Sequence, residues 1–427
     1  MSHIYTTTTI FIPNKMAQKT IYLIDVTNRD GVQTSRLGLS KLQKTIINIY
    51  LNEMGVYQSE IGFPVTRHER NYINANIELA RKGLLKPIVL SGWIRAIKKD
   101  VEGAFASVPQ IRHMNLSIST SDQMIQGKFL GKVTRKDIIQ MMVEAVKLAY
   151  DKGAVDIGVN AEDASRTDSD YLIEFSEAAK EAGAKRIRYC DTLGYDDPFT
   201  IYDAIFKLAK AVKIPIEMHC HNDLGMAVAC SVAGAKAAVD AGVDAYINTT
   251  VNGLGERAGN ADLISTILAV QKSKGFGGKY KLDKRVTLSN SWKIAKYGSY
   301  AFGVPIPINQ PAVGSNAFAH ESGIHADGAI KDWRNYELYH YEEIGRGEPE
   351  IIETGRMITA GEYSGIKGFR NVAGKLEIQF KDDAEAQKIL ELVRYANVHN
   401  QKPLTDGELR FIASYPEEAR LIMTVTP

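Results

Sequence analysis

Residues 216–223 read IEMHCHND, a segment in which an apolar strand pattern leads directly into two histidines one residue apart. Side chains at positions i and i+2 of a β-strand point to the same face of the sheet. His219 and His221 are therefore expected to converge on one point, as two ligands of a shared metal ion must. The alternative interpretation is a pair of unrelated polar residues at a strand end, and the surrounding sequence decides between the two.

The 216–223 segment belongs to a series of similar strand patterns. Short apolar, β-branched runs alternate with longer helical patterns, which indicates βα units and a parallel sheet. The predicted strands cover residues 21–25, 56–61, 87–91, 111–117, 154–159, 186–190, 214–219 and 243–249. Helical patterns lie between them, for example at residues 135–151, 168–182 and 224–241. Left-handed helix caps are expected at Gly83, Gly153, Gly183 and Gly242. Eight βα repeats predict an α/β fold built on a (β/α)₈ TIM barrel.

Polar clusters fall where these predicted strands end. They read DVTNRDGVQ at 25–33, EIGFP at 60–64, SIST at 117–120, NAEDASR at 160–166, DTLG at 191–194 and NGLGERAGN at 252–260. In such barrels the carboxyl ends of all strands meet at one rim, and the chemistry is carried there. Asp30 of the first cluster is therefore expected to lie near His219 and His221.

The sequence predicts four parts. A mobile extension at residues 1–19 precedes the barrel at residues 20–290. The proline-rich run VPIPINQP at 304–311 reads as an extended connection, within a linker subdomain at residues 291–370. Helical periodicity from residue 382 onward predicts a small helical subdomain at residues 371–427.

The bulk composition narrows the class of protein. The chain has 427 residues, 52 Lys and Arg against 50 Asp and Glu, and a net charge of +2, so nothing suggests a nucleic acid as main partner. No apolar run reaches a membrane-spanning length, and the first residues lack a secretion-signal pattern. The three cysteines form no CxxC motif, which suits a reducing, cytoplasmic location.

Asp30, His219 and His221 together form a mixed nitrogen and oxygen donor set for a divalent cation. Such a set suits Mn, Co, Zn or Fe and, less naturally, Mg, and Asn252 can add a carbonyl oxygen. Three or four protein ligands leave positions open for a substrate, so that a chelating 2-oxo acid would have its keto carbon polarised. Arg29 is expected to stabilise the developing oxyanion. The alternative for Arg29 is a salt bridge with Asp25 or Glu60 at the barrel rim.

Three motifs resemble one known family. The strings DVTNRDGVQ (25–33), HCHND (219–223) and NGLGERAGN (252–260) are similar to the acyl-CoA-condensing branch of the DRE-TIM metallolyases. That branch contains 2-isopropylmalate, citramalate and homocitrate synthases and the Re-type citrate synthases. The resemblance spans roughly residues 20 to 370, and the third motif is the most specific.

The resemblance implies a role for each matching residue. The implied metal ligands are Asp30, His219, His221 and Asn252, with Mn, Co, Mg or Zn as the cation. Arg29 is implied to stabilise the keto or enolate oxygen. Gln33, Glu60 and Thr192 are implied to line the pocket for the oxo acid, and Glu162 is implied near the acetyl group. His325 is implied to abstract a proton from acetyl-CoA beside Tyr336. In the family these two residues reach over the partner's barrel, which implies an intertwined homodimer.

The implied chemistry is a Claisen condensation. Acetyl-CoA loses a methyl proton to a base, the enolate attacks the keto carbon of the oxo acid, and water cleaves the thioester; a positioned histidine is the commonest such base. From the residues alone, His325 could equally cap or pack a glycine-rich turn at HESGIHADG (320–328).

Departures from the family pattern bear on the oxo acid. Lysine-pathway homocitrate synthases carry an arginine on the fifth strand that grips the distal carboxylate, whereas this chain has Gly158, Val159 and Asn160 there. Another cation has to take its place for a dicarboxylate substrate, and the candidates are Arg166, Arg188 and Arg95. The strings NRDGVQ, RYCDTLGY (188–195) and GEYSG (361–365) look most like Re-type citrate synthases, which predicts oxaloacetate as substrate and citrate as product.

Other activities remain as alternatives. Homocitrate synthase, acting on 2-oxoglutarate, is the nearest one. A 2-isopropylmalate or citramalate synthase is disfavoured, because full-length isopropylmalate synthases usually carry a large leucine-binding domain that this sequence does not show. A metal-dependent acyl-CoA lyase or aldolase is a further alternative, although the loop at 252–260 lacks the cysteine of HMG-CoA lyases. A non-catalytic metabolite sensor would be expected to have lost some of the motif residues.

Overall fold

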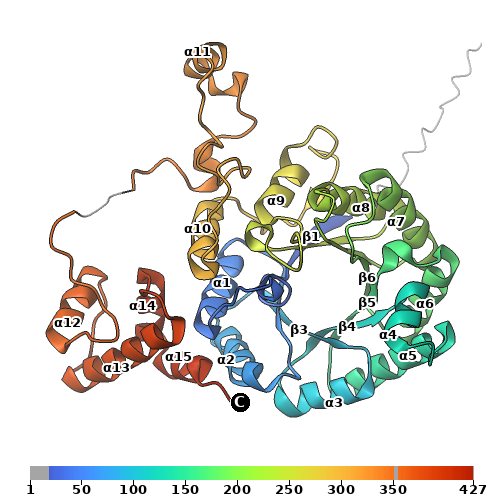
Figure 1. Cartoon of the computed structure of the whole chain (residues 1–427), viewed down its shortest axis with the longest axis horizontal. Coiled ribbons are helices and arrows are strands. Elements are labelled where there is room, and N and C mark those ends of the chain that lie inside the picture. The colour runs from blue at the N-terminus through green and yellow to red at the C-terminus, as the bar shows by residue number, and fades with distance from the viewer. Residues whose placement is uncertain (1–18, 351–353, 427) are drawn as a thin grey trace, which may run out of the picture.

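The computed structural model of the protein describes residues 19–350 and 354–426, so the predicted extension at residues 1–19 lies almost entirely outside the described residues. A closed barrel of parallel strands forms its centre (Figure 1). The barrel strands are β1 (Thr20–Asp25), β2 (Gln58–Gly62), β3 (Val89–Arg95), β4 (His113–Ser119), β5 (Asp156–Glu162), β6 (Arg186–Asp191), β7 (Ile216–Cys220) and β8 (Ala245–Thr249). The ring is closed because β1 pairs with both β2 and β8.

Helices cover the outside of this barrel (Figure 1). They are α1 (Lys41–Glu53), α2 (Arg70–Arg81), α3 (Lys98–Ser107), α4 (Asp122–Phe129), α5 (Arg135–Asp151), α6 (Ser169–Ala182), α7 (Pro198–Val212), α8 (Ala227–Ala241) and α9 (Leu263–Lys272). The predicted TIM barrel and its eight strands are confirmed, with strand bounds displaced by a few residues. The four predicted glycine caps have φ values of 94°, 104°, 111° and 95°.

The barrel interior is unusually polar, and this follows from the alternation of side chains along each strand. On β6, Ile187 packs in the apolar layer beneath the helices, whereas the neighbouring Arg188 points to the barrel axis, and both are buried. Strand register joins the inward residues into layers. Ser117, Asn160, Arg188 and Glu217 are successive register partners on β4 to β7, and the pair Cys190 and His219 lies two residues further along the strands.

The chain beyond the barrel forms an arm and a helical region. After the short strand β9 (Lys281–Leu282), α10 (Ser291–Phe302) packs against α1. The arm carries α11 (Gly323–Lys331) and the 3₁₀ turns η5 (Trp333–Asn335) and η6 (Tyr341–Ile344), and Figure 1 shows α11 standing away from the barrel. Four helices follow, α12 (Ile366–Lys375), α13 (Asp383–Asn400), α14 (Asp406–Ser414) and α15 (Pro416–Met423).

The C-terminal helical region is attached to the barrel, because α15 packs against α1 and α2. A barrel followed by a helical region agrees with the predicted fold class, and the exact domain boundaries stay a prediction. Among the described helices, none combines the length and apolarity needed to cross a membrane.

Candidate active site

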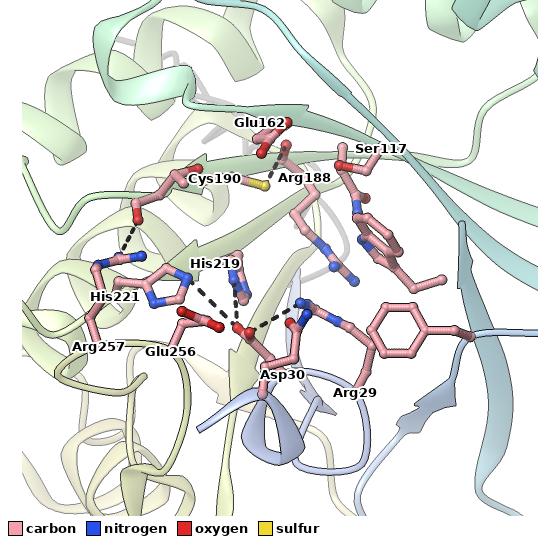
Figure 2. Close-up of a pocket in the computed structure, with 15 residues that line it drawn as sticks. Arg29, Asp30, Ser117, Glu162, Arg188, Cys190, His219, His221, Glu256 and Arg257 are labelled. Carbon is pink, nitrogen blue, oxygen red and sulfur yellow. Dashed lines mark hydrogen bonds and ion pairs between the residues drawn. The ribbon is translucent and has the colours of Figure 1, made fainter. Parts of the chain in front are cut away.

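Asp30, His219 and His221 meet at the carboxyl end of the barrel, as predicted (Figure 2). The Oδ2 atom of Asp30 lies 3.2 Å from Nε2 of His219 and 3.7 Å from Nε2 of His221. Asp30 follows β1, His219 is on β7 and His221 comes just after it, so the strand ends bring the three together. All three side chains are buried, and one ligand atom of each lies within 4.8 Å of the others.

The charges of this cluster suit a cation. Burial alone would raise the pKa of Asp30, but the nearby Arg29 and His219 hold it well below its ordinary value, so the carboxyl is ionised. Burial, reinforced by His219, lowers the pKa of His221 to about 4, so this imidazole is neutral at pH 7. An ionised carboxylate and a neutral imidazole are the protonation states in which these side chains ligate metals.

A hydrogen-bonded chain orients the ring of His219. The amide of Asn248, on β8, donates from Nδ2 to Oε1 of Glu217 at 2.6 Å, so its Oδ1 atom faces His219 Nδ1 at 3.1 Å. Nδ1 therefore carries the proton and donates it, which leaves the Nε2 lone pair directed toward Asp30. The sequence reasoning missed Asn248 and Glu217, although Glu217 stands two residues before His219 and so shares its face.

Asn252 follows β8, at the same end of the barrel as the cluster, and does not line the cavity beside Asp30, His219 and His221. Its Nδ2 donates to the Ala295 carbonyl at 3.0 Å. Its Oδ1 is buried, and within residues 19–350 and 354–426 it has no hydrogen-bond partner; the same holds for Asp30 Oδ2. A buried acceptor of this kind is costly unless another group satisfies it, and a cation is such a group.

Arg29 forms the salt bridge with Glu60 that was one of the two interpretations from the sequence, and its role toward an oxyanion stays a prediction. Its Nε donates to Oε2 of Glu60 at 2.6 Å, and its Nη1 lies 3.3 Å from Oδ1 of Asp30. Glu60 is fully buried below the cavity and does not line it. Burial would raise the pKa of Glu60, but Arg188 and Arg29 lower it to about 2, so Glu60 is a fixed anion that anchors both arginines.

A cavity of about 310 Å³ opens next to the cluster. Eight predicted site residues line it, namely Arg29, Asp30, Gln33, Glu162, Arg188, Thr192, His219 and His221. Seven further residues line it without having been assigned a role from the sequence, namely Phe63, Trp93, Ser117, Asn160, Cys190, Glu256 and Arg257. Ser117 and Asn160 fall in the strand-end clusters of the sequence, and Glu256 and Arg257 fall in the 252–260 motif. The sequence alone does not show which of these side chains face the cavity.

Glu162 stands between this cavity and a second one of about 430 Å³. Both cavities are lined by Glu162, Trp93 and Ser117, and the second adds mainly apolar side chains such as Phe129 and Met141. The Glu162 carboxylate accepts from Ser119 and lies 2.7 Å from Nζ of Lys128.

Besides Glu60 and Asn252, three further predicted site residues do not line the cavity of their own chain. Arg166 is paired with Asp163 at 2.6 Å and does not line the cavity. His325 on α11 and Tyr336 just after η5 stack with ring centroids 4.2 Å apart, and both are exposed on the arm. The predicted roles of His325 and Tyr336 therefore require the cavity of a second chain, and these roles stay predictions.

A closed (β/α)₈ barrel with an Asp-His-His cluster at its strand ends defines the class of barrel metalloenzymes. The family model described as HMGL-like matches residues 20–297, and the one described as homocitrate synthase post-HMGL domain-like matches residues 312–401. The chain belongs to this HMGL-like family, in its acyl-CoA-condensing branch. The family resemblance drawn from the three motifs is confirmed.

Relatives with this organisation match almost the whole chain. A protein named Citrate (Re)-synthase from Dehalococcoides mccartyi (strain CBDB1) is 64% identical over 408 residues, covering 95% of this chain and 98% of that protein. The 2-isopropylmalate synthase 2 of Caldanaerobacter subterraneus subsp. tengcongensis is 39% identical, covering 92% and 95%. Homocitrate synthase 1 of Nostoc sp. is 32% identical, covering 91% and 96%.

Solved structures share the barrel fold. Hydroxymethylglutaryl-CoA lyase from Pseudomonas aeruginosa superposes with a TM-score of 0.55 at 16% identity, covering 67% of this chain and 95% of that one. The HMG-CoA lyase from Brucella melitensis gives a TM-score of 0.54 at 16% identity, covering 67% and 99%. At this identity the likeness concerns the fold alone.

Proposed function

We propose that this protein condenses acetyl-CoA with oxaloacetate and hydrolyses the thioester, giving citrate and free CoA. The observation that carries the proposal is 64% identity, over 95% of the chain, with a protein named Citrate (Re)-synthase. The cavity supports it, because Arg29, Asp30, His219 and His221 come together at the barrel rim.

The residues at the rim fit a divalent metal. Asp30, His219 and His221 offer ligand atoms within 4.8 Å of one another, and buried Oδ1 of Asn252 is a further acceptor. These four residues would hold Mn, Co, Mg or Zn, which suit mixed oxygen and nitrogen donors to different degrees. When bound there, such a cation would supply a Lewis acid for the keto group of the oxo acid.

The residues around the cluster orient the oxo acid. Arg29 presents a guanidinium beside Asp30, where it would stabilise the oxygen that becomes negatively charged as the new carbon–carbon bond forms. Because Glu60 holds Arg29 at 2.6 Å, this charge is positioned before the reaction begins. Gln33 and Thr192 line the cavity and would bind the oxo acid.

The acetyl group is assigned to the side of Glu162. This residue joins the cavity beside the metal ligands to the second, mainly apolar cavity. An apolar channel suits the thioester arm of acetyl-CoA, and the shared wall at Glu162 would bring the acetyl methyl toward the oxo acid.

We also infer that the active enzyme is a homodimer in which the arm completes the partner's site. His325 would take the methyl proton of acetyl-CoA, with Tyr336 stacked on it at 4.2 Å. The exposed side chains Ile324 and Ile330 on α11, at 75% and 85% exposure, support contact with a second copy. The buried free cysteines Cys190, Cys220 and Cys230 support a reducing, cytoplasmic location.

Release of free CoA from acetyl-CoA tests the proposed reaction. The purified protein would be assayed with each of the four metals and with oxaloacetate, 2-oxoglutarate, 2-oxoisovalerate and pyruvate in parallel. The expected result is metal-dependent release with a clear preference for oxaloacetate. A preference for 2-oxoglutarate would make the protein a homocitrate synthase, an alternative favoured by the post-HMGL domain match at residues 312–401. No release with any acid would overturn the condensation itself.

A further inference from the structure

The proposed substrate has a second carboxylate that the metal ligands and Arg29 do not account for. An ionised group in a buried cavity needs a cation or several hydrogen-bond donors, because desolvation is otherwise costly. Among the described residues, the cations that line the cavity beside the metal ligands are Arg29, Arg188 and Arg257. The other two sequence candidates, Arg95 and Arg166, do not line it and pair instead with Asp100 and Asp163.

Two of the three lining arginines are engaged elsewhere. Arg257 lies near the mouth, with a side chain 38% exposed, and it is paired with Asp223 at 2.9 Å. Arg29 lies beside Asp30, at the reacting end of the substrate. Arg188 is the remaining cation, and Figure 2 shows it extending into the cavity that contains His219 and Arg29.

Carboxylates hold Arg188 rigidly in this position. Its Nε donates to Oε1 of Glu217 at 2.6 Å and its Nη2 donates to Oε1 of Glu60 at 2.7 Å. Glu60 is shared with Arg29, and Glu217 is shared with Arg186, so neither carboxylate neutralises Arg188 alone. Nη1 also donates to Oε2 of Glu60 at 3.4 Å. Of the five N–H donors of the guanidinium, the described residues leave one, on Nη2, for a further carboxylate.

Neighbouring polar groups lie in the same layer of the barrel. Ser117, Asn160 and Arg188 are successive register partners on β4, β5 and β6. The amide oxygen of Asn160 faces Arg188 and Trp93, and it accepts hydrogen bonds from Arg188 Nη1 and Trp93 Nε1 at 3.1 Å each. This layer lies two residues deeper than His219, or about 6.6 Å along the strands. An oxo acid held at the metal ligands would therefore direct its far end toward this layer.

We propose that Arg188, with Asn160 and Ser117, binds the distal carboxylate of a 2-oxo dicarboxylic acid and so selects dicarboxylic over monocarboxylic substrates. This inference rests on the proposed condensation and names the residues that determine its substrate class. A substrate ending in a methyl or isopropyl group would leave the buried Arg188 N–H groups facing an apolar carbon. Sites built for a polar group reject analogues that lack it much more strongly than apolar pockets reject one methylene.

The test compares Arg188→Lys with Arg186→Lys as a matched control. Arg186 lies on the same strand and pairs with the same Glu217, at 2.8 Å, but does not line the cavity. Calorimetry on the metal-loaded protein would give the dissociation constants of oxaloacetate and pyruvate. Assays of CoA release would give the kcat/KM values of the same two acids. In Arg188→Lys the preference for oxaloacetate over pyruvate should fall by about 100-fold, and in Arg186→Lys by less than about threefold.

A second variant covers the case in which Arg188→Lys fails to fold. Asn160→Asp keeps Arg188 and the size of the side chain but adds a negative charge beside the proposed carboxylate. It should weaken oxaloacetate binding by about 10-fold or more and leave pyruvate binding within about threefold. Unchanged preference in the folded variants would overturn the assignment of Arg188. Absence of oxaloacetate turnover by the unmodified protein would instead overturn the proposed function.

Discussion

The rim of the barrel and the arm differ in burial. The residues proposed to bind the metal and the oxo acid are buried at the rim, whereas the pair proposed to abstract the proton is exposed on the arm. Asp30, His219 and His221 are at most 6% exposed and are fixed by neighbours such as Arg29 and Asn248. His325 and Tyr336 stack on each other at 4.2 Å but stand exposed on a segment that projects from the barrel (Figure 1). The metal and oxo-acid site proposed for the rim is built from one chain, whereas the role proposed for His325 and Tyr336 requires a second chain beside them.

This difference shows how the burial of a side chain relates to its proposed role. At the rim, buried charges have shifted pKa values and fixed partners, which is how a site is organised before substrate arrives. On the arm, His325 is exposed, and the proposed homodimer would give it its environment. Four changes follow in order of decreasing expected effect. The first two test the division between rim and arm, and the last two test how burial changes the contribution of an ion pair.

Loss of a metal ligand should have the largest effect. Asp30→Ala or His221→Ala should lower kcat by about 10³-fold or more, because the cation that polarises the keto group would be lost. CoA release and the metal content of the gel-filtered protein measure this. The control is His113→Ala at the amino end of β4, which should keep at least about half of the activity. Full activity and full metal content in either ligand variant would contradict the metal assignment.

Removing the arm histidine should have the next largest effect. His325→Ala should lower kcat by about 10²- to 10⁴-fold, the range for loss of a general base, while metal and oxaloacetate binding persist. Mixing this variant with Asp30→Ala after subunit exchange should restore about a quarter of the activity, because half of the random dimers would contain one intact site. A mixture of Asp30→Ala with the variant that carries both Asp30→Ala and His325→Ala should recover no activity. No recovery of activity in the first mixture would contradict the proposal that the rim of one chain and the arm of the other form one active site.

A buried charge cluster away from the site should affect stability and not turnover. Burial would raise the pKa of Glu69, but Lys44 and Lys41 lower it to about 2 from 4.5. A carboxyl with a lowered folded-state pKa stabilises the fold above its unfolded pKa, and this contribution is lost as the pH falls from about 4.5 to about 2. Glu69→Gln should therefore lower the free energy of unfolding by about 3 kcal/mol at pH 7.

Denaturant unfolding between pH 7 and pH 2 measures this effect. The difference between the unmodified protein and Glu69→Gln should shrink as the pH falls through that window, while kcat at pH 7 stays within about twofold. A difference that is constant with pH would mean that the ion pairs of Glu69 with Lys41 and Lys44 are not its source.

The smallest effect is expected for an exposed ion pair. Lys207 on α7 lies 2.9 Å from Asp170 on α6, and their side chains are 56% and 89% exposed. Asp170→Asn should change the free energy of unfolding by less than about 1 kcal/mol, and any effect should disappear in high salt. A loss as large as that of Glu69→Gln would show that burial does not separate the two pairs.

Much of the architecture could be predicted from the sequence because it is local. The eight strands follow from short apolar runs, and the cluster of Asp30, His219 and His221 follows from period-two spacing and the common rim. The depth of a side chain inside the barrel is not local. Arg95, Arg166 and Arg188 were equivalent candidates in the sequence, and only strand register and pairing place Arg188 alone of them in the cavity.

The other residues that the sequence could not place were missed for the same physical reason, because their contacts come from segments that are distant in the sequence. Asn248 orients His219 from a neighbouring strand, and no sequence spacing links the two positions. Glu60 matches a family position that lines the oxo-acid pocket, whereas its contacts with Arg29 and Arg188 hold it below the cavity. In the proposed homodimer the surroundings of His325 would come from a second chain, whose position the sequence pattern does not give.

The most direct test of the central claim is the identity of the product. Acetyl-CoA labelled with ¹³C in its methyl carbon would be incubated with oxaloacetate, metal and the protein, and the products followed by NMR. The proposed function requires the label to appear in a methylene carbon of citrate in step with CoA release, and not with Asp30→Ala. Label that stays in acetyl-CoA or free acetate, while oxaloacetate is unchanged, would contradict it.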